Sequence, residues 1–280
     1  MCLLALAIGV SERWPLVLAS NRDEHRARAT LPLARWTSDQ GATVISGRDL
    51  HAGGTWLGCT PEGRVAMLTN VREATALTAR LSRGDLPMHW LNGHISATDF
   101  LNQHDPSDFG GCNLIIGDYT SAQWHWASNR EFQDKGAGPT RIQASNGWHS
   151  QSLKPGIYGL SNAFLDTPWP KTLALKAAMQ QALNKATASG NESDLLDPLW
   201  AALASTERAA MSELPDTGVT VSQEHELSSA LVDIPERNYG TRNSSLLFIE
   251  AGLERTQCTA TLCEKSWPGD TVRLQWSLAA

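Results

Sequence analysis

Runs of apolar residues, separated by short polar turns, mark the predicted strands of this chain. The first run, residues 2–10, is apolar at nearly every position, and a second, residues 15–20, follows after a short link. Continuous apolar runs of this length are typical of strands that are covered on both faces. A link as short as residues 11–14 favours a hairpin. The pattern therefore predicts a buried β-hairpin whose first strand starts at the N-terminal end.

A secretory signal peptide is the alternative interpretation of residues 2–10. Such peptides begin with basic residues and end at a cleavage site made of small residues. No basic residue precedes this run, and the charged pair Glu12 and Arg13 follows it before any such cleavage site. The strand interpretation is therefore favoured.

Further strands and helices follow in groups. Strands are predicted at residues 43–47, 55–59, 64–69, 112–117, 123–126, 244–249, 256–261 and 271–276. Helical patterns cover residues 85–103, with an interruption at Gly93, and then 170–185 and 195–204. Residues 206–238 are polar and irregular and are predicted to form a long surface loop. Ser96 and Asp99 have the spacing of a capping box. This grouping differs from the alternation of a parallel fold and predicts antiparallel sheets with helices outside, in one domain of residues 1–280.

Composition excludes several classes of protein. The chain has 280 residues and a net charge of −6, and its basic residues are scattered, which argues against a nucleic-acid partner. No apolar run reaches the roughly 18 residues that a membrane span requires. The five cysteines form no Cys-x-x-Cys pair and the histidines form no zinc-protease motif, so neither a disulfide scaffold nor a metal site is expected. A cytoplasmic protein is the default expectation.

Cys2 is the most informative position for chemistry. A cysteine directly after the initiator Met becomes the first residue when Met1 is removed, and its α-amino group can then act as the base for its own thiol. A buried strand that starts at this residue would hold the thiol in a fixed place. The alternative is that Cys2 is an ordinary small apolar residue of a strand.

The polar segment Asn21-Arg22-Asp23-Glu24 follows the second predicted strand. Hairpin geometry would bring the end of that strand beside Cys2, where Asp23 could hold the α-amino group and Arg22 could favour the thiolate. Adjacent strand residues point to opposite faces, so it stays open whether Arg22 faces the thiol. A solvated charged turn is the alternative interpretation.

Three further polar residues complete the candidate site. Asn70 follows a predicted strand, Asn162 lies in the segment 158–163, and Arg242 lies in the segment 239–245. Side-chain amides at strand ends can donate hydrogen bonds to a developing oxyanion. Taken singly, an asparagine is more often a turn residue.

Together these motifs resemble the NRDE family, which is also called the transport and Golgi organisation protein 2 family. The resemblance covers nearly the whole chain in the family's order, and its motifs are Met1-Cys2, Asn21-Arg22-Asp23-Glu24, Gly53-Gly54-Thr55-Trp56-Leu57-Gly58, Gly111-Cys112-Asn113-Leu114-Ile115-Ile116-Gly117-Asp118, and the segments 158–171 and 239–245. That family in turn resembles N-terminal-nucleophile (Ntn) hydrolases of the penicillin V acylase and bile salt hydrolase type. The implied fold is α+β, a four-layer αββα sandwich of two antiparallel sheets.

The resemblance also implies roles for individual residues. It implies catalytic roles for Cys2, Asp23, Asn70, Asn162 and Arg242, and places Asn21 or Arg22 around the amine and thiol of Cys2, where they are candidates for substrate binding. Apart from the resemblance, Trp56, Trp148 and Trp169 flank predicted loops and could line an apolar cleft, and Trp56 and Trp169 are taken as substrate-binding candidates; the alternative is that they are core residues like most of the eleven tryptophans. The acylases carry an arginine three residues before the site aspartate, whereas Ser20 holds that position here. This departure puts the thiol-activating role of Arg22 in question.

Two functions are expected from these residues, and they belong to different classes. The first is an amidohydrolase or acyltransferase that attacks a non-peptide amide through a thioester at Cys2. The second is a carrier of haem or acyl lipid that uses the same scaffold without turnover, as the resemblance implies. No cofactor is expected, although haem is possible as a bound ligand without the covalent Cys-x-x-Cys-His attachment. The expected ligand is a small amide, acyl or haem-like molecule, and a purely structural interaction protein has little support.

Overall fold

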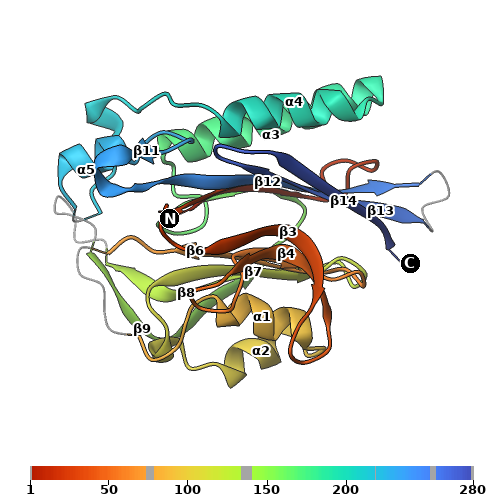
Figure 1. Ribbon diagram of the computed structural model, residues 1–280, viewed down its shortest axis with the longest axis horizontal. Helices are drawn as coiled ribbons and strands as arrows, with labels where there is room; N and C mark the ends of the chain where they lie inside the picture. The colour runs from red at the N-terminus through yellow and green to blue at the C-terminus, as the bar shows by residue number, and fades with distance from the viewer. Residues whose placement is uncertain (1, 74–78, 134–140, 218, 253–256, 279–280) are drawn as a thin grey trace. The chain divides into compact units, whose positions relative to one another are not determined.

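The computed structural model describes residues 2–73, 79–133, 141–217, 219–252 and 257–278. The chain divides into two compact units (Figure 1). The first unit comprises residues 1–27, 154–215 and 220–280, and the second comprises residues 28–153 and 216–219. Each unit contains one antiparallel sheet with helices.

The sheet of the first unit has the strand order β10-β1-β2-β12-β13-β14, with β11 paired to β12. Its strands are β1 (Cys2–Ile8), β2 (Leu16–His25), β10 (Gly156–Leu160), β11 (Asp233–Ile234), β12 (Tyr239–Ala251), β13 (Cys258–Ser266) and β14 (Thr271–Leu278). Its helices are α3 (Pro170–Ser189), α4 (Glu192–Leu203) and α5 (Val221–Glu226). The first strand therefore lies inside the sheet, between β10 and β2.

Helices α3 and α4 lie along one face of this sheet (Figure 1). Alternate strand residues such as Leu3, Val17 and Phe248 form one core with Leu175 of α3 and Leu199 of α4. Side chains at alternate positions of a strand share a face, so Cys2, between Met1 and Leu3, lies on the face away from these helices. The alternation of faces along each strand therefore decides which side chains can lie on the same face of the sheet as the Cys2 thiol.

The sheet of the second unit runs in sequence order from β3 to β9. Its strands are β3 (Thr30–Thr37), β4 (Thr43–Asp49), β5 (Leu57–Cys59), β6 (Arg64–Asn70), β7 (Cys112–Asp118), β8 (Gln123–Gln133) and β9 (Arg141–Ser152). Helices α1 (Asp85–Asn92) and α2 (Ala97–Gln103) pack on one face, where Leu86 and Phe100 meet Leu114 and Ile116 of β7. Ser96 caps α2 by accepting a hydrogen bond from the backbone N–H of Asp99, as its spacing predicts.

The structure confirms the first hairpin and corrects several boundaries. Strand β2 continues to His25, so the polar segment 21–24 belongs to a strand and not to a turn after it. Strands β3, β9 and β10 were not predicted, and the excursion 206–238 contains the short helix α5 and strand β11. Helix α3 extends to Ser189, where Gly190 ends it in the left-handed conformation that favours glycine.

Candidate active site

Cys2 is the first residue of β1 and is half-buried. Its backbone carbonyl accepts a hydrogen bond from the hydroxyl of Ser161 at 3.0 Å, which anchors the start of the strand. Among the described residues, no group forms a hydrogen bond with the thiol. Burial raises the pKa of the Cys2 thiol and the Asp23 carboxylate raises it further, whereas the terminal amine and the Arg22 guanidinium lower it.

Arg22 lies on the same face of the sheet as Cys2. The two residues are direct partners in the antiparallel register of β1 and β2, and directly opposed residues point to the same side. Arg22 is only 6% exposed. The question left open by the sequence is therefore answered by register: the guanidinium shares the face of the thiol.

Asn21 lies on the opposite face and is fully buried. Its side-chain amide donates to the backbone carbonyls of Leu203 and Ala230, at 2.8 Å each, and its oxygen accepts a hydrogen bond from the Ser244 hydroxyl at 2.5 Å. These bonds tie β2 to the end of α4 and to β12. The contacts give Asn21 a structural role, which differs from its predicted role in substrate binding.

Asp23 is fixed by the neighbouring strand β12. The Thr241 hydroxyl donates to Oδ1 of Asp23 at 2.7 Å, and the same hydroxyl accepts a hydrogen bond from the backbone N–H of Val232. Asp23 is 1% exposed, so its carboxylate has one orientation set by buried partners. Thr241 was not predicted as a site residue, although it lies inside the motif of residues 239–245.

Arg242 occupies an irregularity in β12. The register with β2 shifts between Thr241 and Asn243, which leaves Arg242 as the extra residue of a β-bulge. Its guanidinium donates to the backbone carbonyls of His25 and Arg26, at 3.1 and 3.0 Å. These bonds hold the end of β2 beyond the segment that carries Arg22 and Asp23.

Asn162 lies two residues beyond the end of β10. The last register pair of that strand joins Leu160 to Leu4, which is two residues after Cys2. The hydrogen bond from Ser161 to the Cys2 carbonyl continues this alignment, and Asn162 is fully buried. The first unit thus brings a buried amide beside the start of β1.

Two further buried polar residues share the face of Cys2. Asn243 is the register partner of Arg22, and its amide donates to the carboxylate of Glu264 on β13. Both side chains are at most 5% exposed. The sequence alone did not identify Glu264 as a site residue, because its position on the same face as Cys2 depends on the register of several strands.

The other predicted residues have different surroundings. Asn70 is the last residue of β6 in the second unit, where it pairs with Cys112. Trp56, also in the second unit, is 8% exposed, and Trp169, the residue before α3, is 7% exposed. Both indoles are buried, so the structure gives no open cleft at either of them.

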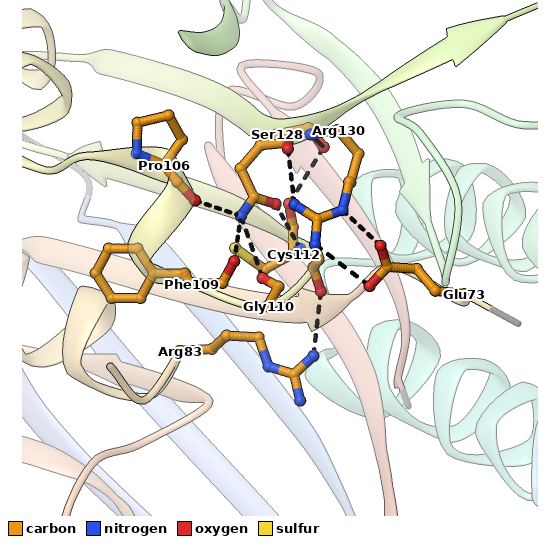
Figure 2. Close-up of polar contacts among 10 residues, drawn as sticks. Glu73, Arg83, Pro106, Phe109, Gly110, Cys112, Ser128 and Arg130 are labelled. Atoms are coloured by element: carbon orange, nitrogen blue, oxygen red, sulfur yellow. Dashed lines mark hydrogen bonds and ion pairs between the residues drawn. The ribbon is translucent and has the colours of Figure 1, made fainter. Parts of the chain in front are cut away.

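A second cysteine of the chain, Cys112, lies in a cluster of charged and polar side chains (Figure 2). Arg130 forms an ion pair with Glu73 at 2.6 Å, and the two side chains are 2% and 14% exposed. The side-chain amide of Asn129 donates to the carbonyls of Pro106, Phe109 and Gly110, while its oxygen accepts the backbone N–H of Cys112. Burial raises the pKa of the Cys112 thiol to about 12.

Metal chemistry has no support in the part of the chain that the structure describes. No group of three or more His, Cys, Asp or Glu side chains there could hold a metal ion. In the same residues, no helix combines the length and apolar character needed to cross a membrane.

Comparison with solved structures places the fold in the class of the Ntn hydrolases. The chain is similar to the Caenorhabditis elegans N-acylethanolamine-hydrolyzing acid amidase ortholog, with a TM-score of 0.50, 9% sequence identity, and coverage of 88% of this chain and 92% of that chain. This confirms the predicted α+β class with two antiparallel sheets and helices. The family model described as Transport and Golgi organisation 2 matches residues 1–266, and the chain belongs to this family.

Two relatives cover most of the chain. The human Transport and Golgi organization protein 2 homolog is 28% identical over 249 residues, which are 84% of this chain and 82% of the relative. The Mus musculus homolog is 27% identical over 260 residues, 89% of this chain and 87% of the relative. The family resemblance predicted from the motifs is therefore confirmed.

Proposed function

We propose that the protein is an N-terminal-cysteine amidohydrolase or acyltransferase that acts on a non-peptide amide. The observation that carries this proposal is the setting of Cys2. It starts an internal strand, its thiol has no hydrogen-bond partner among the described residues, and its register partner Arg22 on the adjacent strand shares the face of the thiol. A nucleophile on a rigid element is positioned for attack without loss of conformational freedom.

The proposed chemistry needs the amine that removal of Met1 would leave on Cys2. This amine takes the thiol proton, and the sulfur attacks the substrate carbonyl to form a tetrahedral intermediate. The C–N bond then breaks as the proton passes to the leaving amine, which gives a thioester on Cys2. Attack by water on the thioester releases the acid and the free thiol, whereas attack by a second amine transfers the acyl group.

Each neighbouring residue has a role in this proposal. Asp23 holds the α-amine, and Arg22 favours the thiolate, because its charge lowers the pKa of the Cys2 thiol. Asn162 donates to the oxyanion, where one such donor typically contributes about 3–4 kcal/mol of barrier lowering. Arg242 supports the end of β2 that carries Asp23.

Acyl amides with an apolar chain are the first substrates to test. The name of the structural neighbour from C. elegans describes hydrolysis of N-acylethanolamines.

Intact-mass spectrometry and a hydrolysis assay test the proposal together. We expect the mass of a chain that begins at Cys2, hydrolysis of at least one N-acyl amide in a panel of chain lengths, and a covalent acyl adduct after rapid acid quenching. Cys2→Ala should abolish turnover and adduct, whereas Cys258→Ala, a change at the other half-buried cysteine, should affect neither.

Two outcomes would contradict the proposal. Retention of Met1 in the cell would remove the α-amine base. Binding of haem or acyl lipid that Cys2→Ala leaves unchanged, without hydrolysis of any amide, would favour a carrier instead.

A further inference from the structure

A cavity of about 250 Å³ lies within the second unit, apart from the residues assigned to the Cys2 chemistry. Strand residues Trp36 and Arg48 and turn residue Asp39 line it from the sheet, and Asp85, Met88 and His89 line it from α1. Pockets for drug-sized ligands span about 300–1,000 Å³. The volume therefore suits a small metabolite better than a long acyl chain.

Arg48 is the unusual member of this cavity. Its guanidinium carbon lies 4.6 Å from the centre of the Trp36 ring, a cation–π contact that orients the planar group. In the described parts of the chain, Arg48 has no hydrogen bond or ion pair, and its Nε is buried without a partner. An arginine offers five N–H donors in a fork that matches a carboxylate. The cavity thus presents a prepared donor group that lacks an acceptor.

Two carboxylates also line the cavity. Asp85 begins α1, and burial raises the pKa of its carboxyl while the nearby His89 lowers it. Asp39 is exposed at the turn after β3. Neither carboxylate forms an ion pair with Arg48 among the described residues, so the cavity is lined by both signs of charge without a direct pair between them.

His89 adds a neutral acceptor. Nδ1 of His104 lies 2.7 Å from the carbonyl of Phe100 and can only donate to it, so Nε2 of His104 accepts from Nδ1 of His89 at 2.9 Å. Burial and His104 lower the pKa of His89, which keeps its ring neutral at pH 7. With Arg48 positive and Asp39 and Asp85 negative, a ligand with two negative charges would be repelled.

The walls of the cavity are fixed before any ligand binds. The Ser38 hydroxyl donates to the side chain of Asn92, whose amide donates to the carbonyl of Met88, and this joins the turn after β3 to α1. Behind Gly53, which lines the cavity, a Cβ on Gly54 would lie 2.3 Å from the carbonyl oxygen of Gly84. The Gly53-Gly54 motif therefore permits a close backbone approach that supports the cavity.

We propose that this cavity binds a small zwitterion, with its carboxylate on the Arg48 fork and its ammonium group facing Asp85 and Asp39. A single carboxylate satisfies the unpaired donors of Arg48, and a cation at the other end compensates the desolvated Asp85. The cavity shares no lining residue with the site proposed at Cys2, so binding there can be tested independently of the Cys2 chemistry.

Nuclear magnetic resonance of the arginine Nε–H signals in the full chain tests this proposal directly. The signal of Arg48, assigned by its loss in Arg48→Lys, is followed during titration with unbranched ω-amino acids from glycine to 6-aminohexanoate. Fatty acids and alkylamines of equal chain length serve as matched single-charge probes. We expect one ω-amino acid to shift the signal saturably and to bind at least about tenfold more tightly than either matched probe.

Three variants sharpen the test. Arg48→Gln should weaken binding of that amino acid by about tenfold or more, whereas Arg35→Gln, on the neighbouring strand and outside the cavity, should leave it unchanged. Asp85→Asn should reduce the preference for the zwitterion over the matched fatty acid. Equal binding of zwitterion and fatty acid, tighter binding of inorganic phosphate, or no saturable shift with any probe would each overturn the proposal.

Discussion

The regions around Cys2 and Cys112 contain similar residues in opposite states. Each cysteine starts a strand of its own unit and has an arginine, an acidic residue and an asparagine nearby. Around Cys112 the polar groups bind one another and the loop carbonyls, and the thiol is fully buried (Figure 2). Cys2 as a residue is half-buried, and its thiol, whose pKa burial also raises, has no hydrogen-bond partner in the described residues.

The comparison teaches that composition alone does not define a reactive site. Asn129 binds backbone groups of residues 106, 109, 110 and 112, and Arg130 binds Glu73 and the carbonyl of Asn129, so these polar groups serve to hold a loop. Near Cys2, Ser161 instead binds the backbone of β1, and Asp23 is bound by Thr241 of the neighbouring strand, so the thiol itself stays without a hydrogen bond among the described residues. Four predictions test this distinction.

The largest expected effect follows from removing the charge that compensates Arg130. Glu73→Gln would leave a guanidinium that is 2% exposed without its carboxylate, and the free energy of unfolding should fall by about 3–5 kcal/mol. Urea denaturation followed by circular dichroism measures the change. Asp108→Asn breaks the matched exposed pair with Arg80, which is 73% exposed, and should cost at most about 1 kcal/mol. If the two variants lose the same free energy of unfolding, the Arg130–Glu73 pair does not stabilise the fold as a buried ion pair.

The second prediction concerns the two thiols directly. In the native protein at pH 8, iodoacetamide should label Cys2 at least about 100-fold faster than Cys112, because Cys112 is buried and its thiol pKa is about 12. Peptide mapping by mass spectrometry gives both rates in one experiment. Rapid labelling of Cys112 in the native protein would show that its thiol is as accessible as that of Cys2 and would contradict the difference between the two regions.

The third prediction tests how tightly the Cys112 cluster is packed. A Cβ on Gly111 would lie 2.6 Å from Oε2 of Glu73 and 3.1 Å from Nε of Arg130. Gly111→Ala should therefore displace the ion pair and reduce the unfolding free energy by about 1–3 kcal/mol. Gly147→Ala, where the added Cβ would meet nothing within 4 Å, is the control and should be nearly neutral.

The smallest expected effect is electrostatic and concerns Cys2. Arg22 lowers the pKa of the Cys2 thiol, so Arg22→Gln should raise that pKa. The pH profile of Cys2 alkylation should then move to higher pH, and the alkylation rate at pH values below the pKa should fall. Arg22→Lys keeps the charge and should keep most of the profile. An unchanged profile in Arg22→Gln would mean that the guanidinium does not influence the thiol.

Much of the fold could be predicted because the central strands are apolar on both faces. Strands β1, β2, β7 and β12 are buried along most of their length, and their sequences show it. The edge strands β3 and β9 were not predicted, and each pairs on one side only. Strand β3 contains Pro32 and buries only Leu33, so its apolar residues form no buried run, and β9 has few apolar residues.

The candidate site was predicted only where motif and topology coincide. Cys2, Arg22 and Asp23 are related by one short hairpin, so the sequence places them together. The Asn243–Glu264 contact joins residues of two later strands, and Arg22 meets Asn243 only through the shifted register of β2 and β12. Periodicity alone cannot reveal a pairing that depends on an extra residue.

The bulge at Arg242 has a consequence for how this chain can change in length. The bulge determines which face of the sheet each later side chain of β12 occupies, and Leu246 and Phe248 point into the core with α3 and α4. Deleting Arg242 would remove the bulge and make Thr241 and Asn243 neighbours in the same register with β2, so Leu246 and Phe248 would keep their side. Deleting one residue in the regular part of β12 after Asn243 would instead reverse the alternation and turn the later side chains toward the opposite face. A loss of one residue is therefore tolerable at the bulge and harmful a few positions further along the same strand.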